Sequence, residues 1–278
     1  MRGWLLGVLL CLSLPLCSAE RVVSLAPFLT DMLVLLEADA RLVGVIDDPS
    51  LPESLGAVPR IGAYQSLSLE RIVAARPDLV LAWTSGNPPE LLSRLEALGI
   101  KVLRFDPQRL ADIQPMTLEL GRTLERADTA RTLSARFATA LQALRAPDDA
   151  PRVRVFLQVW DEPMFTVAGE QLLSDALEHC GAVNSFAALP GLSPQVSTEA
   201  VMASQPEMII AVAADEATGT RWLRRWEAFP AIPAVRDAQL WTLESDSLVR
   251  PTPRIVEGMR RLCMLIQSRP VLKSPASS

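Results

Sequence analysis

Short apolar runs alternate with amphipathic segments along the chain from residue 22 onward. A run of four or five apolar residues is typical of a strand buried in a parallel sheet, and a 3.6-residue apolar period is typical of a helix packed on it. The apolar runs predict strands at 22–25, 42–46, 79–82, 101–105, 153–159, 208–211 and 239–243. The segments between them predict helices at 30–38, 89–98, 171–179 and 222–229. This alternation indicates an α/β fold of two Rossmann-like lobes.

Two segments, 68–82 and 197–211, repeat one pattern at a constant offset of 129 positions. In each copy a serine can cap a short helix, a glutamate follows in the first turn, and a proline ends the helix before an apolar run. The two glutamates are Glu70 and Glu199. First-turn helix stabilisation explains each of them singly, whereas their symmetry also suits a two-fold symmetric partner with two basic pockets.

A helical pattern without interruption separates the two halves. Leu133, Phe137, Leu141 and Leu144 form one apolar stripe, and Pro147 ends the pattern. We predict a single long α-helix that bridges the lobes and spans roughly 25 Å; a packing helix within one domain is the alternative. The predicted organisation is a signal peptide (1–19), an N-terminal lobe (20–127), the bridging helix (128–148), a C-terminal lobe (149–270) and a flexible tail (271–278).

The first nineteen residues have the build of a secretory signal peptide. Arg2 precedes an apolar run at 4–16, and small residues precede a cleavage site near Ala19. A membrane anchor, or a lipoprotein acylated at Cys17, is the alternative. The signal peptide predicts a product outside the cytoplasm. Without Arg2 the mature chain carries 26 basic and 32 acidic residues, a net charge of −6, which makes nucleic acid an unfavourable partner.

Cysteine and histidine usage narrows the chemistry further. Cys180 and Cys263 remain after cleavage and predict a disulfide in an oxidising compartment, with two buried free thiols as the alternative. His179 is the only histidine, so a three-histidine metal site is impossible and histidine-based catalysis is hard to build. The sequence shows no nucleophile elbow, P-loop or dinucleotide motif, which argues against an exported hydrolase.

Aromatic side chains make up only 5% of the chain, yet several lie where strands end. Ligands of such folds bind outside the carboxyl ends of the strands, and flat apolar side chains suit a large, partly apolar ligand. Each aromatic on its own is equally compatible with packing. The predicted ligand-binding residues are Tyr64, Trp83, Trp160 and Phe165, together with Asp246 and Arg250 after the last strand.

Several motifs, taken in order, resemble a known family. They are Arg21-Val-Val-Ser-Leu-Ala-Pro, 42–45, 68–83, 98–102, Arg154-Val-Phe-Leu-Gln, Glu178-His-Cys-Gly-Ala, Pro194-Gln-Val-Ser and Pro253-Arg-Ile. The ordered set resembles the vitamin B12 branch of the helical-backbone (class III) substrate-binding proteins of bacterial ABC importers. The chain departs from that pattern at Ser193, where a tryptophan is usual, and at Trp160, where a small residue is usual.

The resemblance implies a periplasmic, monomeric receptor without enzymatic activity or a cofactor, whose cargo is cobalamin or a related corrinoid. Tyr64 and Trp83 would line one wall of the inter-lobe site, and Phe165, Asp246 and Arg250 the other. Trp160 would refill part of the pocket. Glu70 and Glu199 would meet arginines of the two permease subunits. An iron-siderophore or haem receptor of the same fold is the alternative.

Overall fold

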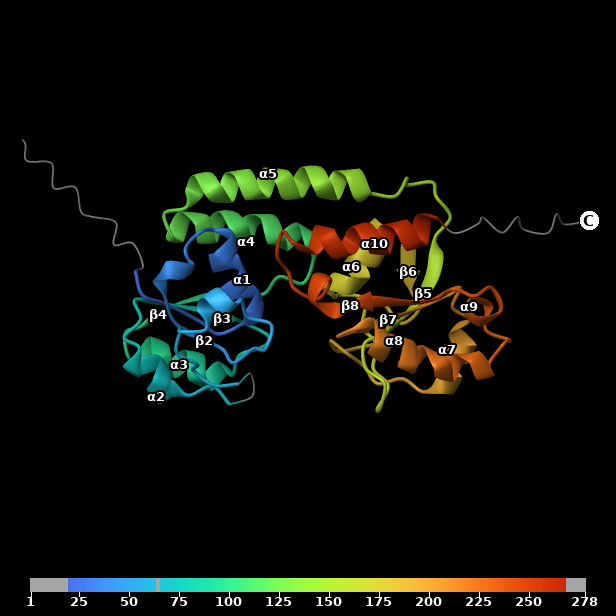
Figure 1. Ribbon diagram of the computed structural model, residues 1–278, viewed down its shortest axis with the longest axis horizontal. Helices are drawn as coiled ribbons and strands as arrows, with labels where there is room; N and C mark the ends of the chain where they lie inside the picture. The colour runs from blue at the N-terminus through green and yellow to red at the C-terminus, as the bar shows by residue number, and fades with distance from the viewer. Residues whose placement is uncertain (1–19, 64–65, 269–278) are drawn as a thin grey trace, which may run out of the picture.

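The computed structural model describes residues 20–63 and 66–268 and contains two parallel four-stranded sheets (Figure 1). The first sheet has the order β2-β1-β3-β4 and the second the order β6-β5-β7-β8. The strands are β1 (Val22–Ser24), β2 (Leu42–Val45), β3 (Leu79–Trp83), β4 (Lys101–Phe105), β5 (Val153–Gln158), β6 (Ala182–Asn184), β7 (Met208–Ala213) and β8 (Leu240–Glu244). The predicted α/β fold with two lobes is confirmed.

Helices cover both sheets and connect the lobes. The first lobe has α1 (Pro27–Leu35), α2 (Leu69–Ala74) and α3 (Pro89–Ala97). The second has α6 (Leu172–His179), α7 (Thr198–Ser204), α8 (Glu216–Leu223), α9 (Pro233–Arg236) and α10 (Ile255–Gln267). Between them lie α4 (Leu110–Thr123) and α5 (Ala127–Leu144), and short 3₁₀ turns occur at Asp39–Arg41, Glu53–Leu55, Arg224–Ala228 and Ser245–Ser247.

The two lobes follow one plan, as the internal repeat predicts. In each sheet the first strand of the lobe lies between its second and third strands, and the fourth lies at the edge. The helix before the third strand begins alike in both lobes. Ser68 Oγ accepts a hydrogen bond from the Arg71 N–H at 3.2 Å, and Ser197 Oγ accepts one from the Ala200 N–H at 3.2 Å. Each serine thus satisfies a free amide of the first turn.

The apolar runs form strands because both faces of each sheet are covered. Alternate residues of β7 enter two different cores: Met208 and Ile210 pack on one side of the sheet, and Ile209 and Ala211 on the other. The third strand of the first lobe divides its residues in the same way between two cores. A strand buried on both faces needs a continuous apolar run, and that is the pattern in the sequence.

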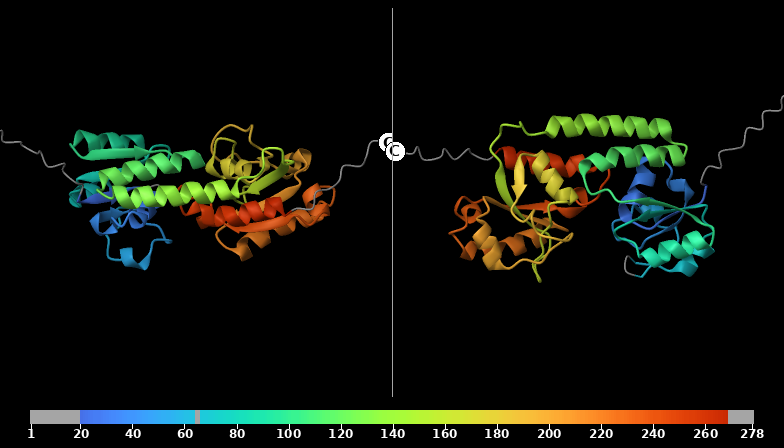
Figure 2. Two further views of the ribbon diagram at one scale, coloured as in Figure 1. Left: turned by 90° about the horizontal axis from the view of Figure 1, so that it is seen from above. Right: turned by 180° about the vertical axis from the view of Figure 1, so that it is seen from behind.

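The long helix predicted at 128–148 is present as α5 (Ala127–Leu144), and a second helix, α4, runs beside it. Both α4 and α5 run along one side of the molecule, next to one another (Figures 1 and 2). Ile113 of α4 and Phe137 of α5 belong to a core of the second lobe, whereas Leu120 of α4 and Ala130 of α5 belong to a core of the first. The bridge is therefore an antiparallel helix pair, and a substituent at Gly121 would collide with Ala130 where the pair is tightest.

Two helix boundaries also differ from prediction. The first helix begins at Pro27 rather than at residue 30, because proline is well suited to the first helical position. The helix predicted at 222–229 begins earlier, after Asp215, whose side chain accepts a hydrogen bond from the Thr218 N–H at 2.7 Å. It then continues as the 3₁₀ turn at Arg224–Ala228.

The predicted disulfide is present and links Cys180, at the end of α6, to Cys263 of α10. The predicted signal peptide and C-terminal tail lie outside the described residues. Within the part of the chain that the structure describes, no helix has the length and apolar character required to cross a bilayer.

Candidate ligand-binding site

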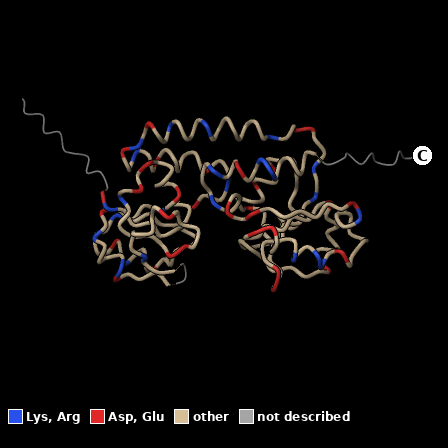
Figure 3. The backbone as a smooth tube through the Cα atoms, viewed as in Figure 1, with Lys and Arg blue, Asp and Glu red and all other residues tan. Residues whose placement is uncertain are grey.

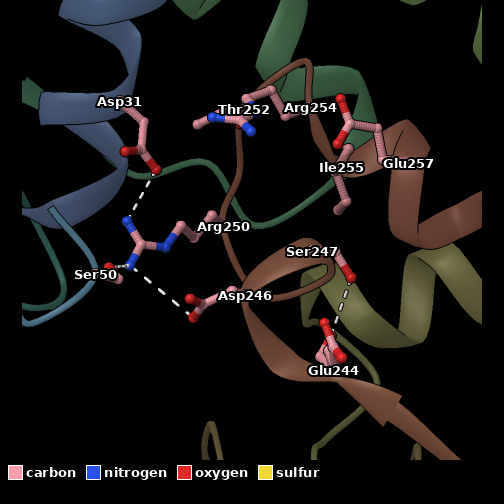
Figure 4. Close-up of a pocket in the computed structure, with 10 residues that line it drawn as sticks. All are labelled: Asp31, Ser50, Glu244, Asp246, Ser247, Arg250, Thr252, Arg254, Ile255 and Glu257. Carbon is pink, nitrogen blue, oxygen red and sulfur yellow. Dashed lines mark hydrogen bonds and ion pairs between the residues drawn. The ribbon is translucent and has the colours of Figure 1, made fainter. Parts of the chain in front are cut away.

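A first cavity, of about 250 Å³, opens between the two lobes (Figure 4). We call it the ion-pair pocket. Its first-lobe residues come from α1 and from the loop after β2, and its second-lobe residues come from the end of β8 and the segment leading into α10. The lining is Asp31, Ser50, Glu244, Asp246, Ser247, Arg250, Thr252, Arg254, Ile255 and Glu257.

Arg250 crosses this pocket from the second lobe to the first. Its Nη1 donates to Asp31 Oδ2 at 2.9 Å, and its Nη2 donates to Asp48 Oδ2 at 3.0 Å and to the hydroxyl of Ser50. Asp246, from the same lobe as Arg250, lies 4.0 Å away and is 71% exposed. A ligand in this pocket therefore meets a guanidinium that already holds the lobes together.

Burial and charge act against one another at this ion pair. Burial raises the pKa of the Asp31 carboxyl, and the neighbouring Arg250 guanidinium opposes that shift without cancelling it. Burial also disfavours the charged form of Arg250, but Asp31 and Asp48 outweigh it, so that the pKa of Arg250 is raised. The guanidinium is charged at neutral pH, and Asp31 depends on it for much of its compensation.

A second cavity, of about 470 Å³, opens at the carboxyl ends of β5 and β7 in the second lobe. We call it the aromatic pocket. Trp160 and Trp222 form one side of it, with ring centroids 6.1 Å apart. The remaining lining is Val159, Asp161, Glu162, Val212, Ala213, Ala214, Thr218, Arg221 and Ser245.

The two pockets are neighbours. Glu244 and Asp246 line the ion-pair pocket, whereas Ser245, between them in sequence, lines the aromatic pocket. Both therefore lie at the end of β8, where ligands of open α/β sheets bind.

Trp160 lies on a turn that side-chain hydrogen bonds of the neighbouring residues hold in place. Asp161 Oδ1 accepts hydrogen bonds from Gln158 Nε2 at 3.0 Å and from Arg225 Nη1 at 2.7 Å. Gln158, which is fully buried, also accepts a hydrogen bond from Trp226 Nε1 at 2.9 Å. The buried network holds the turn in place, while the Trp160 side chain remains 57% exposed.

Phe165 lies beside Trp160, with which it forms an isolated antiparallel bridge. Its backbone pairs with Trp160 on one side and with Gln195 on the other, and its N–H donates to the Trp160 carbonyl at 3.2 Å. The Pro194-Gln195 segment of the family motif is thereby brought to the same edge of the second sheet.

Trp83 ends β3 on the first lobe and is half-buried. Its Nε1 donates to Asp106 Oδ1 at 2.9 Å, and its ring meets Phe28 edge-on at 6.0 Å. The structure thus places Trp83 at the carboxyl edge, but in neither of the two pockets. Tyr64, predicted to share its wall, lies outside the described residues.

Glu70 and Glu199 occupy equivalent exposed positions in the first turns of α2 and α7. A hydrogen bond from its own backbone N–H lowers the pKa of each carboxyl, and the neighbouring serine hydroxyl lowers it further. Both helices lie on the side of the molecule opposite α5 (Figures 1 and 2). The two carboxylates therefore stay charged and are presented on one side of the protein, one from each lobe.

Sequence reasoning missed three residues that shape the two pockets. Asp31 lies inside a helix and carries no local signal of a binding role. Trp222 packs within the second lobe and is only 8% exposed, yet it also lines the aromatic pocket. Asp48 lies in the loop after the second strand, and that position is the signal that could have identified it.

The distribution of charged and metal-ligating side chains gives no sign of a further site among the described residues. Basic and acidic residues are interspersed over both lobes (Figure 3). Among the described residues no cluster of three or more His, Cys, Asp or Glu side chains is placed to hold a metal ion. His179 lies at the end of α6, where its Nε2 is 2.7 Å from the Leu141 carbonyl of α5.

Comparison with known proteins defines the class of the chain. The model of the periplasmic binding protein family matches residues 22–247, and the chain belongs to this family. The vitamin B12-binding protein of Vibrio parahaemolyticus is 31% identical over 272 residues, covering 93% of this chain and 97% of the relative.

Solved structures share the fold. The crystal structure of the periplasmic vitamin B12 binding protein of Vibrio cholerae matches with a TM-score of 0.82 and 30% identity, covering 90% of this chain and 97% of that one. A periplasmic haem-binding protein in complex with two haems has a TM-score of 0.77 at 22% identity, covering 89% of this chain and 98% of that one. The second likeness shows the fold alone.

Proposed function

We propose that this chain is a periplasmic receptor that binds vitamin B12 or a related corrinoid between its lobes and delivers it to an ABC transporter permease in the inner membrane. The carrying observation is the 30% identity, over nearly the whole chain, to a structure that binds vitamin B12. The cavities at the carboxyl edge of the second sheet support a ligand at this place. Cobalamin is the cargo rather than a cofactor, and the chain, acting as a monomer, binds it without catalysis.

The two walls of this site have different chemistry. On the first lobe, Trp83 offers a ring edge that Phe28 and Asp106 already hold in place; Tyr64 is proposed to join it. On the second lobe, Trp160 and Phe165 offer aromatic surface, while Asp246 and Arg250 offer charge. Flat apolar surface with few fixed polar groups suits a large macrocycle that carries polar substituents at its rim.

Haem or an iron-siderophore is the alternative cargo, and the position of His179 weighs against haem. Haem iron in proteins is held by axial side chains such as histidine, tyrosine or methionine. The only histidine is at the end of α6, against Leu141, and not in either pocket.

Calorimetric titration tests the proposal directly. Purified mature protein should release heat with cyanocobalamin at micromolar concentration and should show a one-to-one stoichiometry. Haem and a ferric siderophore, titrated under the same conditions, should give no saturable heat. Saturable binding of haem or the siderophore, with none for cyanocobalamin, would overturn the assignment.

A further inference from the structure

Trp160 is held in an arrangement that the free protein does not require. The buried Gln158 and the Arg225–Asp161 ion pair fix its turn, yet the residue Trp160 is 57% exposed. A tryptophan ring stabilises a protein when its apolar surface is covered. A rigid turn that keeps the ring uncovered is a preorganised surface for something that covers it on binding.

Two of the polar side chains at this pocket, Trp160 and Arg221, already have partners within the protein. Trp160 Nε1 donates to the Glu162 carbonyl at 3.2 Å. Arg221 Nη2 donates to Thr218 Oγ1 at 3.3 Å, and that hydroxyl in turn donates to Asp215 at 3.0 Å. The Trp160 ring and the apolar side chains of Val212, Ala213 and Ala214 line the same pocket. This apolar surface favours a flat apolar group of a ligand.

The size and position of the aromatic pocket agree with a substituent of a ligand bound between the lobes. At about 470 Å³ it falls within the usual range for small-molecule sites, whereas the neighbouring ion-pair pocket, at about 250 Å³, lies below it. Consecutive residues Glu244, Ser245 and Asp246 line the two pockets in turn. One ligand can thus reach both.

We propose that the aromatic pocket holds the planar aromatic base appended to a corrinoid, and that Trp160 stacks on that base and selects corrinoids that carry it. This inference rests on the function proposed above. Aromatic stacking on a base contributes a factor of about ten or more to affinity. The corrin ring itself then lies outside the aromatic pocket, so the stacking is separable from binding of the macrocycle.

The test compares cobalamin, which carries a benzimidazole nucleotide, with cobinamide, which lacks it. Calorimetry on the intact mature protein should show that Trp160→Ala weakens cobalamin binding about tenfold and leaves cobinamide binding unchanged. Trp160→Phe should restore most of the loss, because it keeps a stacking face. Trp241→Ala is the matched control, since Trp241 is 37% exposed on β8 and lines neither pocket.

Each other outcome contradicts the inference in a distinct way. Equal weakening of both ligands by Trp160→Ala would mean that the ring contacts the macrocycle. No weakening of either would mean that the pocket is not used. If the unaltered protein bound neither ligand, the proposed function would fail and the inference with it. Circular dichroism of each variant confirms that the fold is retained.

Discussion

The two lobes share a plan but differ at the carboxyl edges of their sheets. Both sheets have the same strand order, and both place a glutamate in a serine-capped first turn. At the carboxyl edge, however, the first lobe contributes the carboxylates of Asp31 and Asp48. Arg250 of the second lobe forms ion pairs with both of them. The shared features suit a two-fold symmetric partner, and the different ones suit an asymmetric ligand.

The aromatic side chains show the same contrast. Trp83 is half-buried, and Asp106 of the same lobe accepts its indole hydrogen. Trp160 is exposed on a turn that the second lobe holds rigid. The second lobe is therefore expected to contribute more of the ligand selectivity, and the first lobe more of the fixed wall.

The largest expected effect is the loss of stability on removing the disulfide, which only the second lobe contains among the described residues. The Cys180–Cys263 disulfide lies in the second lobe and closes a sequence separation of 83 residues. In the chain-entropy model such a closure stabilises by about 4–5 kcal/mol. Urea unfolding of a Cys180→Ala, Cys263→Ala variant should show this loss, with the second lobe unfolding first. Reductant should lower the midpoint of the unaltered protein alone; an equal shift in the variant would contradict the explanation.

The next effect concerns the ion pair that joins the lobes. Arg250→Ala leaves Asp31 and Asp48 without their shared counter-charge, and removal of one partner of a largely buried pair costs about 3 kcal/mol. Urea unfolding at neutral pH measures this loss. Arg236→Ala is the matched control, because the Arg236 side chain is 60% exposed and its ion pair with Asp237 contributes less than about 1 kcal/mol.

The loss at Arg250→Ala should depend on pH. Burial already raises the pKa of Asp31 above its usual value, and without Arg250 that pKa rises further. A carboxyl whose pKa is raised on folding opposes folding when it is ionised, and this penalty disappears as the pH falls through the raised pKa. The stability difference should therefore shrink in mild acid. A difference that grows on acidification would mean that Asp31 is not the group left uncompensated.

Local patterns predicted most strands and the repeat because each signal lies within a few residues. The apolar run of β7 is buried on both faces, and the cap at Ser197 needs only the Ala200 amide three residues on. Helix α4 was missed because Pro115 lies inside it, and proline argues against a helix interior. Its pairing with α5 is a tertiary contact that no local period encodes.

The candidate site was predictable only where it follows strand ends. Position alone indicated Trp160, Phe165, Asp246 and Arg250. The partner of Arg250, Asp31, lies 219 positions away along the chain, and no spacing rule connects two lobes over that distance. Trp222 is largely buried, and no sequence pattern reveals that a buried side chain also lines a cavity.

A smaller effect tests whether Glu70 and Glu199 contribute equally to docking on the transporter. Glu70→Ala and Glu199→Ala should each raise the receptor concentration needed for half-maximal stimulation of the transporter ATPase by about tenfold. Corrinoid affinity should not change, because neither residue lines a pocket. Glu90→Ala and Glu216→Ala are the controls, since both are exposed first-turn glutamates on other helices. A loss from only one of the two docking variants would break the two-fold comparison.

The smallest effect compares the two caps. Ser68→Ala and Ser197→Ala each remove the acceptor for one first-turn amide, at a cost of about 1 kcal/mol in the free energy of unfolding. Each change also removes the hydroxyl that helps to lower the pKa of Glu70 or Glu199, so both pKa values should rise, as NMR titration can measure.

The backbone hydrogen bond of each glutamate remains in these variants, so neither pKa should return fully to its ordinary value. Ser93→Ala is the matched control, because that hydroxyl donates to the Pro89 carbonyl within α3 and caps no free amide. It should leave stability unchanged or slightly increased, since alanine is the better helix former. Equal losses at Ser68 and Ser197 would show that the repeat preserves the energetics of the cap as well as its geometry, whereas unequal losses would restrict the symmetry to the carboxylates.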